Sequence, residues 1–311
     1  MAEMGFYGRV AIITGAGRGI GRAHALLLAQ RGAAVVVNDL GGGGRGGGSD
    51  ATVASAVAEE IQRAGGVALA DVSDISSDAG ATHLVDAAIG AYGRVDIVIN
   101  NAGIAVPDHF PSTDFDNVRK HVEVHLAGSY NVTRAAWPHM DHAKYGRVVM
   151  TISSAIFGTD KYLSYSVAKA GTLALARGLA LRGRRCGILV NSVAPLAATR
   201  LSPRADVAAA PVDADADPTF VSALVALLAH ESCPTSGEAF TAGKRRFARI
   251  VLSETAGQVC AEQTVTPEFV LDRWREICDL ADQEAMPDVV RWAISNEAHL
   301  ARADRPGDSS R

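Results

Sequence analysis

The chain has 311 residues, a formal net charge of −4, and 48% hydrophobic and 21% charged residues. This composition is ordinary for a globular protein, and the length suits one large α/β domain or two small ones. It excludes a strongly basic nucleic-acid-binding protein, and no apolar run reaches the roughly 18 residues of a membrane span.

The first residues lack the basic and apolar regions of a secretory signal. The four cysteines are scattered, without a Cys-x-x-Cys pair, which favours reduced thiols over a disulfide framework. We therefore predict a cytoplasmic protein with no metal site, no nucleic-acid partner and no membrane partner.

Short apolar runs alternate with longer stretches of helical character along the first 243 residues. In chain order we predict a strand at 10–13, a helix at 22–31, a strand at 34–37, a helix at 51–64, a strand at 67–70, a helix at 78–92, a strand at 95–99, a helix at 115–140, a strand at 146–152, a helix at 165–185, a strand at 188–193 that Pro195 ends, a helix at 219–229 and a strand at 237–243. Residues 41–49 are almost all glycine, and we expect a mobile loop there.

This alternation predicts an α/β fold, a doubly wound parallel sheet of the Rossmann type. Residues 1–243 are expected to form this domain. Residues 244–311 are expected to form a C-terminal helical extension packed on the same domain, with helices near 267–281 and 287–301. The Ala-, Asp- and Pro-rich segment 199–218 is interpreted as a substrate-side loop. Such sheets bind ligands beyond the carboxyl ends of their strands, where the motifs below fall.

A glycine-rich turn, Thr14-Gly-Ala-Gly-Arg-Gly-Ile-Gly21, follows the first predicted strand. Glycines let the backbone approach phosphates, and the start of the next helix offers free N–H groups and a positive dipole. The turn therefore predicts a dinucleotide pyrophosphate site, and its candidate residues are Gly15, Arg18, Gly19, Ile20 and Gly21.

Three further strand ends carry candidate cofactor contacts. Asp39 lies 18 residues beyond Gly21, where a carboxylate can accept both adenosine ribose hydroxyls and repel a 2′-phosphate. It favours NAD over NADP, although a solvated loop acid is the alternative. Asp71 and Val72 could hold the adenine edge or form a simple turn. The fourth strand ends in Asn101, Ala102 and Gly103, whose small residues allow close packing against a cofactor or form an ordinary turn.

Tyr165 and Lys169 lie four residues apart and share a helix face. A free tyrosine has a pKa of about 10, too high for a base at neutral pH. A nearby ammonium group and the positive nicotinamide favour the phenolate, and a shift of about three units needs roughly 4 kcal/mol. The pair therefore predicts proton transfer coupled to hydride transfer between an alcohol and a nicotinamide.

These motifs, in this order together with Ser153, resemble the short-chain dehydrogenase/reductase family over about residues 8 to 243. Several phrases are more closely similar to the (3R)-hydroxyacyl-CoA dehydrogenase domain of the peroxisomal multifunctional β-oxidation enzyme. They are Val35-Val-Val-Asn-Asp-Leu-Gly-Gly, Val124-His-Leu-Ala-Gly-Ser-Tyr, Thr133-Arg-Ala-Ala-Trp-Pro-His-Met, and Thr266-Pro-Glu with Trp274-Arg-Glu-Ile-Cys-Asp.

The resemblance implies roles for individual residues. Ser153 would bind the substrate oxygen, Tyr165 would act as acid and base, and Lys169 would hold the nicotinamide ribose and also tune Tyr165. The backbone around Pro195 and the hydroxyl of Thr199 would fix the carboxamide of the cofactor.

The chain departs from the family pattern at three places. His125 stands where the family usually has an asparagine that helps bind a proton-relay water, so His125 is either a catalytic-site residue or a packing histidine. The interval from Ser153 to Tyr165 is one residue shorter than usual, which leaves Ser154 as an alternative. Leu196 follows Pro195 where many relatives have glycine.

The resemblance implies NAD-dependent oxidation of a secondary alcohol to a ketone, with a (3R)-3-hydroxyacyl-CoA as substrate. A 17β-hydroxysteroid or steroid side-chain CoA dehydrogenase is the alternative, and a non-catalytic dinucleotide-sensing regulator is a more remote one. A homodimer or homotetramer is implied by the resemblance alone. Basic residues that could meet the phosphates of an acyl-CoA, or form a solvated run, are Lys244, Arg245, Arg246 and Arg249.

Overall fold

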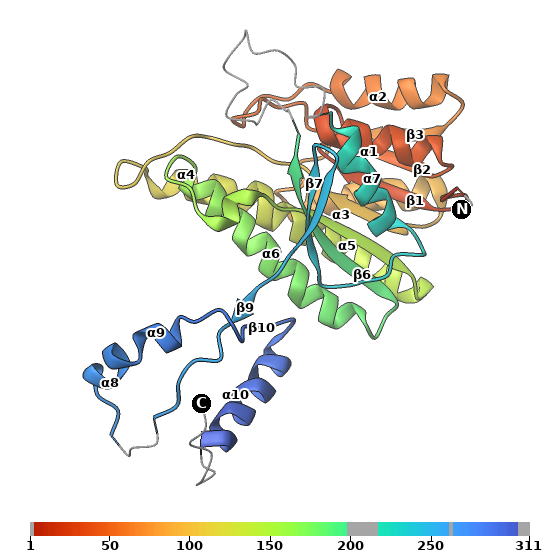
Figure 1. The fold of residues 1–311 in the computed structure, drawn as a ribbon. Helices are drawn as coiled ribbons and strands as arrows, with labels where there is room; N and C mark the ends of the chain where they lie inside the picture. The colour runs from red at the N-terminus through yellow and green to blue at the C-terminus, as the bar shows by residue number, and fades with distance from the viewer. Residues whose placement is uncertain (1–2, 198–216, 261–263, 304–311) are drawn as a thin grey trace. The chain divides into compact units, whose positions relative to one another are not determined.

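A computed structural model describes residues 3–197, 217–260 and 264–303. Its eight-stranded sheet has the order β3-β2-β1-β4-β5-β6-β7-β8 (Figure 1). The strands are β1 (Val10–Thr14), β2 (Ala34–Asn38), β3 (Val67–Asp71), β4 (Ile97–Asn100), β5 (Gly146–Thr151), β6 (Ile188–Leu196), β7 (Ala239–Gly243) and β8 (Arg246–Ile250). The strands from β1 to β7 pair in parallel, and the order reverses between β1 and β4. This confirms the doubly wound fold and sets the switch point at β1 and β4.

Helices cover both faces of the sheet, because alternate residues of each strand point to opposite sides. Ile13 of β1 packs in the core under α1, α2 and α7, whereas Ile12 packs under α3, α5 and α6. The helices on the first face are α1 (Gly19–Gln30), α2 (Thr52–Arg63) and α7 (Thr219–Ala229), and those on the second are α3 (Asp78–Tyr92), α5 (Gly128–Ala143) and α6 (Leu163–Gly183). Because the two layers cover the faces of the sheet, the ends of its strands are where such a fold binds ligands.

The long helix predicted at 115–140 is divided into three parts. Helix α4 (Phe115–His121) begins at Asp114, whose carboxylate accepts the Asn117 N–H at 3.0 Å. A π-helical turn (Val122–Ala127) follows, and α5 then continues the helix. Such turns are rare and often occur at functional sites. The turn carries His125, so the interruption sits beside a predicted site residue.

Strand β6 does not end before Pro195, as the sequence predicted, but continues to Leu196. Its pairing with β5 stops at Val193, whose carbonyl accepts the Ile152 N–H, whereas β7 pairs with β6 through Leu196. Pro195 lies two residues after Val193, so its nitrogen points to the same side of β6 as that of Val193, toward β5. Strand β5 has already ended at that point. The missing N–H of proline therefore costs no ladder hydrogen bond there.

Strand β8 was not predicted, and it lies at the edge of the sheet beside β7. The two residues between β7 and β8 are Lys244 and Arg245, with φ of 50° and 59°. Two consecutive left-handed residues are typical of a tight hairpin, but such turns usually use Asn and Gly, so no local pattern predicted this one. Two of the basic residues considered for acyl-CoA phosphates have other contacts: Arg249 pairs with Glu238 at 2.7 Å, and Arg245 lies over the Phe220 ring.

The chain divides into two compact units at Arg249 and Ile250, six residues beyond the predicted boundary. Within the described part of the second unit, β9 (Ser253–Glu254) pairs antiparallel with β10 (Glu284–Ala285). The helix expected near 267–281 is two short helices, α8 (Pro267–Asp272) and α9 (Trp274–Ile277), and α10 (Val289–Ala303) corresponds to the second predicted helix. The packing of the extension on the first unit stays a prediction. In the described ranges, no helix has the length and apolar character needed to cross a membrane.

Candidate active site

The glycine turn and the end of β4 meet at the switch point of the sheet. The Thr14 hydroxyl accepts the backbone N–H groups of Asn101 and Ala102 at 3.0 and 3.1 Å. The Asn101 side chain donates to the carbonyls of Thr14 and Gly15. A Cβ on Gly15 would lie 2.7 Å from the Ala102 Cα, so only glycine allows this approach. Asn101 and Gly15 therefore build the turn whose backbone faces the cavity.

A cavity of about 710 Å³ opens at this edge, within the usual range for small-ligand sites. Nine of the predicted cofactor residues line it: Gly15, Arg18, Gly19, Ile20, Gly21, Asp39, Asn101, Ala102 and Gly103. They come from the ends of β1, β2 and β4 and from the start of α1. The cavity thus has the shape and the free helix N-terminus that an extended dinucleotide requires.

Asp39 lies immediately after β2 with its carboxylate at the cavity. One oxygen accepts the Gly17 N–H at 2.9 Å, and the other accepts the Gly41 N–H at 2.8 Å. A carboxylate has about four lone-pair positions, so each oxygen can accept one further hydrogen bond. Asp39 can therefore hold the glycine turn and a pair of ribose hydroxyls together.

Residues 41–48, called here the glycine loop, form part of the cavity wall. As predicted, the loop contains no helix or strand. It nevertheless has defined contacts: Gly43 N–H donates to Gly47 O at 3.0 Å, Gly46 N–H donates to Gly43 O at 2.9 Å, and Arg18 donates to Gly42 O at 3.4 Å. The loop is a built component of the site, a role that the composition did not predict.

Asp71 and Val72, predicted at the adenine edge, do not line the cavity. The Asp71 carboxylate accepts hydrogen bonds from Asn38 at 2.7 Å and from the Ser73 N–H at 2.9 Å. It therefore joins the ends of β2 and β3. The cavity wall at that strand end is formed by the next four residues, Ser73, Asp74, Ile75 and Ser76, which the sequence analysis did not single out.

Tyr165 and Ser153 face each other where α6 begins and β5 has ended. Burial raises the pKa of Tyr165, and the side chain of Ser153 has a smaller effect in the opposite direction. Protein groups alone therefore do not produce the lowering that the sequence analysis expected. Ser154 is the exposed first residue of a short 3₁₀ helix (Ser154–Phe157), so Ser153 is the serine that meets Tyr165.

Lys169 lies one turn along α6 from Tyr165 and is fully enclosed. Its Nζ is 5.6 Å from the centre of the Tyr165 ring and donates a hydrogen bond to the carbonyl of Thr151, the last residue of β5. Burial lowers the pKa of Lys169 from 10.5 to about 7. Because the lysine is only partly charged at neutral pH, it stabilises the phenolate less than a full ammonium would, which agrees with the raised pKa of Tyr165.

His125 lies against Tyr165, with ring centroids 5.1 Å apart and the rings nearly perpendicular. Burial holds the pKa of His125 well below its usual value, with Lys169 acting in the same direction. Its Nε2 is 2.7 Å from the Ile104 carbonyl, whereas its Nδ1 is buried without a partner. A Cβ on Gly103 would lie 2.4 Å from this ring, so Gly103 is required where His125 stands.

Two neighbours of the site were missed by the sequence analysis. His121, one turn before His125, stacks on it at 6.0 Å and 9°, and its ring is 6.3 Å from that of Tyr165. The buried Asp108 accepts the Ser164 N–H at 2.9 Å and so holds the first turn of α6. The His-x-x-x-His spacing could have drawn attention to His121, but no local signal indicates Asp108.

Two remaining predictions concern the carboxamide end of the cofactor. Pro195 lies near the carboxyl end of β6, beyond the last residue that pairs with β5. Thr199 lies outside the residues that the structure describes. The described geometry therefore covers the adenosine side of the predicted cofactor site and the Ser, Tyr and Lys group.

The sequence profile of the short chain dehydrogenase family matches residues 9–202. The chain belongs to this family. The chain is 41% identical over 283 residues to a curated protein, peroxisomal multifunctional enzyme type 2 of Mus musculus. The match covers 89% of this chain and 37% of that enzyme. It is 37% identical over 250 residues to hydroxyacyl-CoA dehydrogenase ChsB1 of Mycobacterium tuberculosis, with 74% of each protein covered. The chain spans between 31% and 61% of the length of the curated multifunctional relatives that it matches.

Solved structures agree with the assignment of this chain to the short-chain dehydrogenase family. The full-length multifunctional enzyme type 2 of Drosophila melanogaster superposes with a TM-score of 0.79 at 28% identity, covering 96% of this chain and 50% of that one. A 7α-hydroxysteroid dehydrogenase complexed with NADH and 7-oxo glycochenodeoxycholic acid superposes with a TM-score of 0.67 at 29% identity, covering 76% and 93%. The chain is thus an oxidoreductase of a family that acts on CH–OH groups and generally uses NAD or NADP.

Proposed function

We propose that this protein oxidises the 3-hydroxyl group of a (3R)-3-hydroxyacyl-CoA to a ketone, with NAD as hydride acceptor. The observation that carries the proposal is the Tyr165–Lys169 pair: the buried Lys169 lies one turn along α6 with its Nζ 5.6 Å from the centre of the Tyr165 ring. His125, which packs on that ring, also contacts Gly103 and Ile104 of the wall of a cavity of about 710 Å³. The hydroxyacyl-CoA dehydrogenase named above supports the substrate class.

The residues present fit a dinucleotide. Gly15, Gly19 and Gly21 place backbone without side chains at the cavity beside the start of α1, and Asp39 retains lone pairs for ribose hydroxyls. A negative carboxylate at this position repels a 2′-phosphate, which supports NAD over NADP. When bound, NAD supplies a hydride acceptor and a positive charge near Tyr165.

Each site residue has a role in the proposed reaction. The Ser153 hydroxyl holds the substrate oxygen, and the Tyr165 oxygen takes its proton as the carbon gives up a hydride and the C=O bond forms. Lys169 binds the nicotinamide ribose through its Nζ and favours the phenolate. His125 packs behind Tyr165, and its unpartnered Nδ1 can accept a hydrogen bond from a relay water.

A hydroxysteroid is a second candidate substrate, because the 7α-hydroxysteroid dehydrogenase shares the fold at 29% identity. Purified protein is mixed with NAD and a panel that pairs (3R)-hydroxyacyl-CoAs of graded chain length with hydroxysteroids and steroid side-chain CoA esters. NADH absorbance is recorded. Turnover of straight-chain thioesters supports the proposal, turnover of steroids alone transfers the activity to sterols, and binding of NAD without any turnover supports a dinucleotide-sensing regulator. The homo-oligomer and the cytoplasmic location remain proposals of the same kind.

A further inference from the structure

The segment 104–108, called here the hinge segment, connects the cofactor cavity to the catalytic helix. Ile104 contacts the ring of His125, and Val106 contacts the ring of His121. At its end, the Asp108 N–H donates to the Lys161 carbonyl at 2.9 Å, and the Asp108 carboxylate holds Ser164 of α6. The segment is therefore fixed both to the helix that carries the histidines and to the start of α6.

His121 fixes the middle of the hinge segment. Its Nδ1 donates to the Asn117 carbonyl at 2.8 Å, so its Nε2 carries the lone pair that accepts the Val106 N–H at 3.2 Å. The side chain is fully buried, and its ring is held flat on that of His125. Both ring nitrogens are therefore bonded to backbone, and a change at His121 releases the Val106 amide.

The hinge segment in turn holds the glycine loop. The Ala105 N–H, the amide directly before Val106, donates to the Gly44 carbonyl at 2.9 Å. On the same side, a Cβ on Gly46 would make ordinary contact, 3.7 Å, with the Ile104 side chain and, at 3.8 Å, with Lys120. Ala105 and Ile104 thus attach the apex of the glycine loop, which has no helix or strand, to the rest of the protein.

We propose that His121 is a positioning residue that acts on cofactor binding, by holding the Val106 amide and thereby the Ala105–Gly44 bond that closes the glycine loop over the cavity. The effect is transmitted from His121 to Val106, to Ala105 and then to Gly44. His121 contacts the Tyr165 ring only by its edge, so the hydrogen-bonding role is separable from packing.

The inference rests on the proposed function for its kinetic part only. Replacing His121→Phe keeps an aromatic ring against His125 and Tyr165 but removes the acceptor for Val106. We expect the KM for NAD to rise about tenfold, because the variant loses roughly one hydrogen bond that holds the glycine loop. The kcat should change less than about threefold. His121→Gln retains an amide oxygen that can accept the Val106 N–H, and it should recover most of the affinity.

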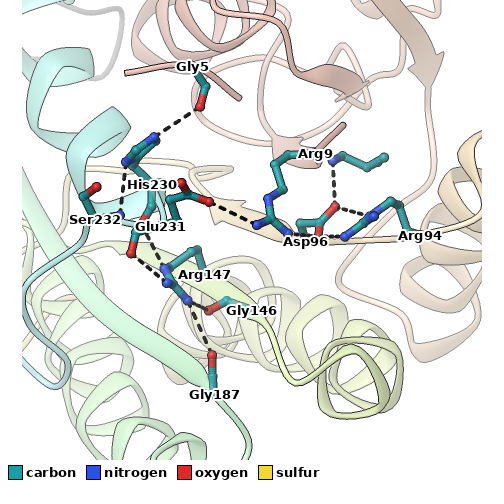
Figure 2. A network of polar contacts seen from close by, with 11 residues as sticks. Gly5, Arg9, Arg94, Asp96, Gly146, Arg147, Gly187, His230, Glu231 and Ser232 are labelled. Carbon is teal, nitrogen blue, oxygen red and sulfur yellow. Dashed lines mark hydrogen bonds and ion pairs between the residues drawn. The ribbon is translucent and has the colours of Figure 1, made fainter. Parts of the chain in front are cut away.

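His230 provides the matched control. It is buried, its Nε2 donates to the Gly5 carbonyl at 3.2 Å, and its Nδ1 accepts the Ser232 N–H at 3.1 Å, so it has the same bonding pattern as His121 (Figure 2). His230→Phe should lower stability without changing the KM for NAD.

Hydrogen exchange of peptides that cover 41–49 and 104–108, measured without NAD, tests the link independently of any activity. Faster exchange of both peptides in His121→Phe, but not in His230→Phe or His121→Gln, supports the inference. Unchanged exchange at 41–49 in His121→Phe overturns it, as does equal loosening of this peptide in His230→Phe. Absence of NAD binding by the unmodified protein would contradict the proposed function, and the exchange result would still decide the inference.

Discussion

The two ends of the central strands are built in opposite ways. At the amino ends of β1, β4 and β5, buried Asp96 accepts hydrogen bonds from Arg94, from Arg9 and from the Val10 N–H (Figure 2). Within the described residues, six buried polar atoms lack partners. Four of them lie around the carboxyl ends, Asn100 Oδ1, Asp108 Oδ1, His125 Nδ1 and Thr151 Oγ1, and the other two are His24 Nε2 in α1 and Ser192 Oγ in β6. Buried polar groups in proteins are normally satisfied, so the four exceptions around one end of the sheet are consistent with a ligand site there.

The same contrast holds for two buried cations. The Arg147 guanidinium donates to the carbonyls of His230, Glu231, Gly146 and Gly187 and lies 4.3 Å from the centre of the Tyr145 ring. The Nζ of Lys169 donates to one backbone carbonyl of the described residues, that of Thr151, and burial lowers the pKa of Lys169 to about 7. We therefore expect the amino end to stabilise the fold and the carboxyl end to retain groups that cost stability and that serve the proposed reaction.

The largest expected effect is at the catalytic end. Tyr165→Phe removes the proton acceptor, and kcat should fall by about 10³-fold, the usual size of a lost general acid–base contribution. NAD binding and the melting temperature should stay close to those of the unmodified protein, because the ring and its packing remain. Steady-state kinetics and a thermal-shift titration with NAD measure these quantities. Retained turnover would show that another group moves the proton.

At the amino end, Arg147→Met should lower the free energy of unfolding by about 3 kcal/mol. The substitution leaves buried backbone carbonyls without their donor, and each such group is costly. Urea denaturation measures the loss, and kcat of the folded variant should be unchanged. A stability equal to that of the unmodified protein would mean that the network contributes no net stability.

The matched substitution at the catalytic end should have the opposite sign. Lys169→Met should raise the free energy of unfolding in the absence of NAD by about 2 kcal/mol below pH 7, although it abolishes activity. The folded-state pKa of about 7 lies below the unfolded value of 10.5, so between these pH values the unfolded chain binds a proton that the folded chain does not. Stability of the unmodified protein therefore rises with pH across this window, and the gain of the variant shrinks. A pH-independent difference would contradict the lowered pKa.

The smallest expected effect concerns cofactor choice. Asp39→Asn keeps an oxygen acceptor for the glycine turn but removes the negative charge, and the preference for NAD over NADP should fall about tenfold, or about 1.4 kcal/mol. Binding titrations with both cofactors measure the ratio. An unchanged ratio would assign the discrimination to another group.

Local sequence patterns predicted the alternating strands and helices. The apolar runs placed all seven predicted strands within two residues of their observed start, and the 78–92 and 219–229 helices agree with α3 and α7. The glycine turn and the Tyr-x-x-x-Lys spacing were readable because phosphate binding and a shared helix face are properties of neighbouring residues. The sheet order confirmed the predicted fold class, and the match to the family profile confirmed the predicted family.

The sequence by itself determined the doubly wound sheet, the family and nine of the residues that line the cavity, because periodicity and short spacings encode them. Only the tertiary structure decided what depends on distant neighbours. Pro195 remains in β6 because β5 has already ended, Asp71 joins two strands instead of lining the cavity, and burial lowers the pKa of Lys169. The glycine loop acquires its place from Ala105, about sixty residues further along the chain, a contact that no local pattern can show.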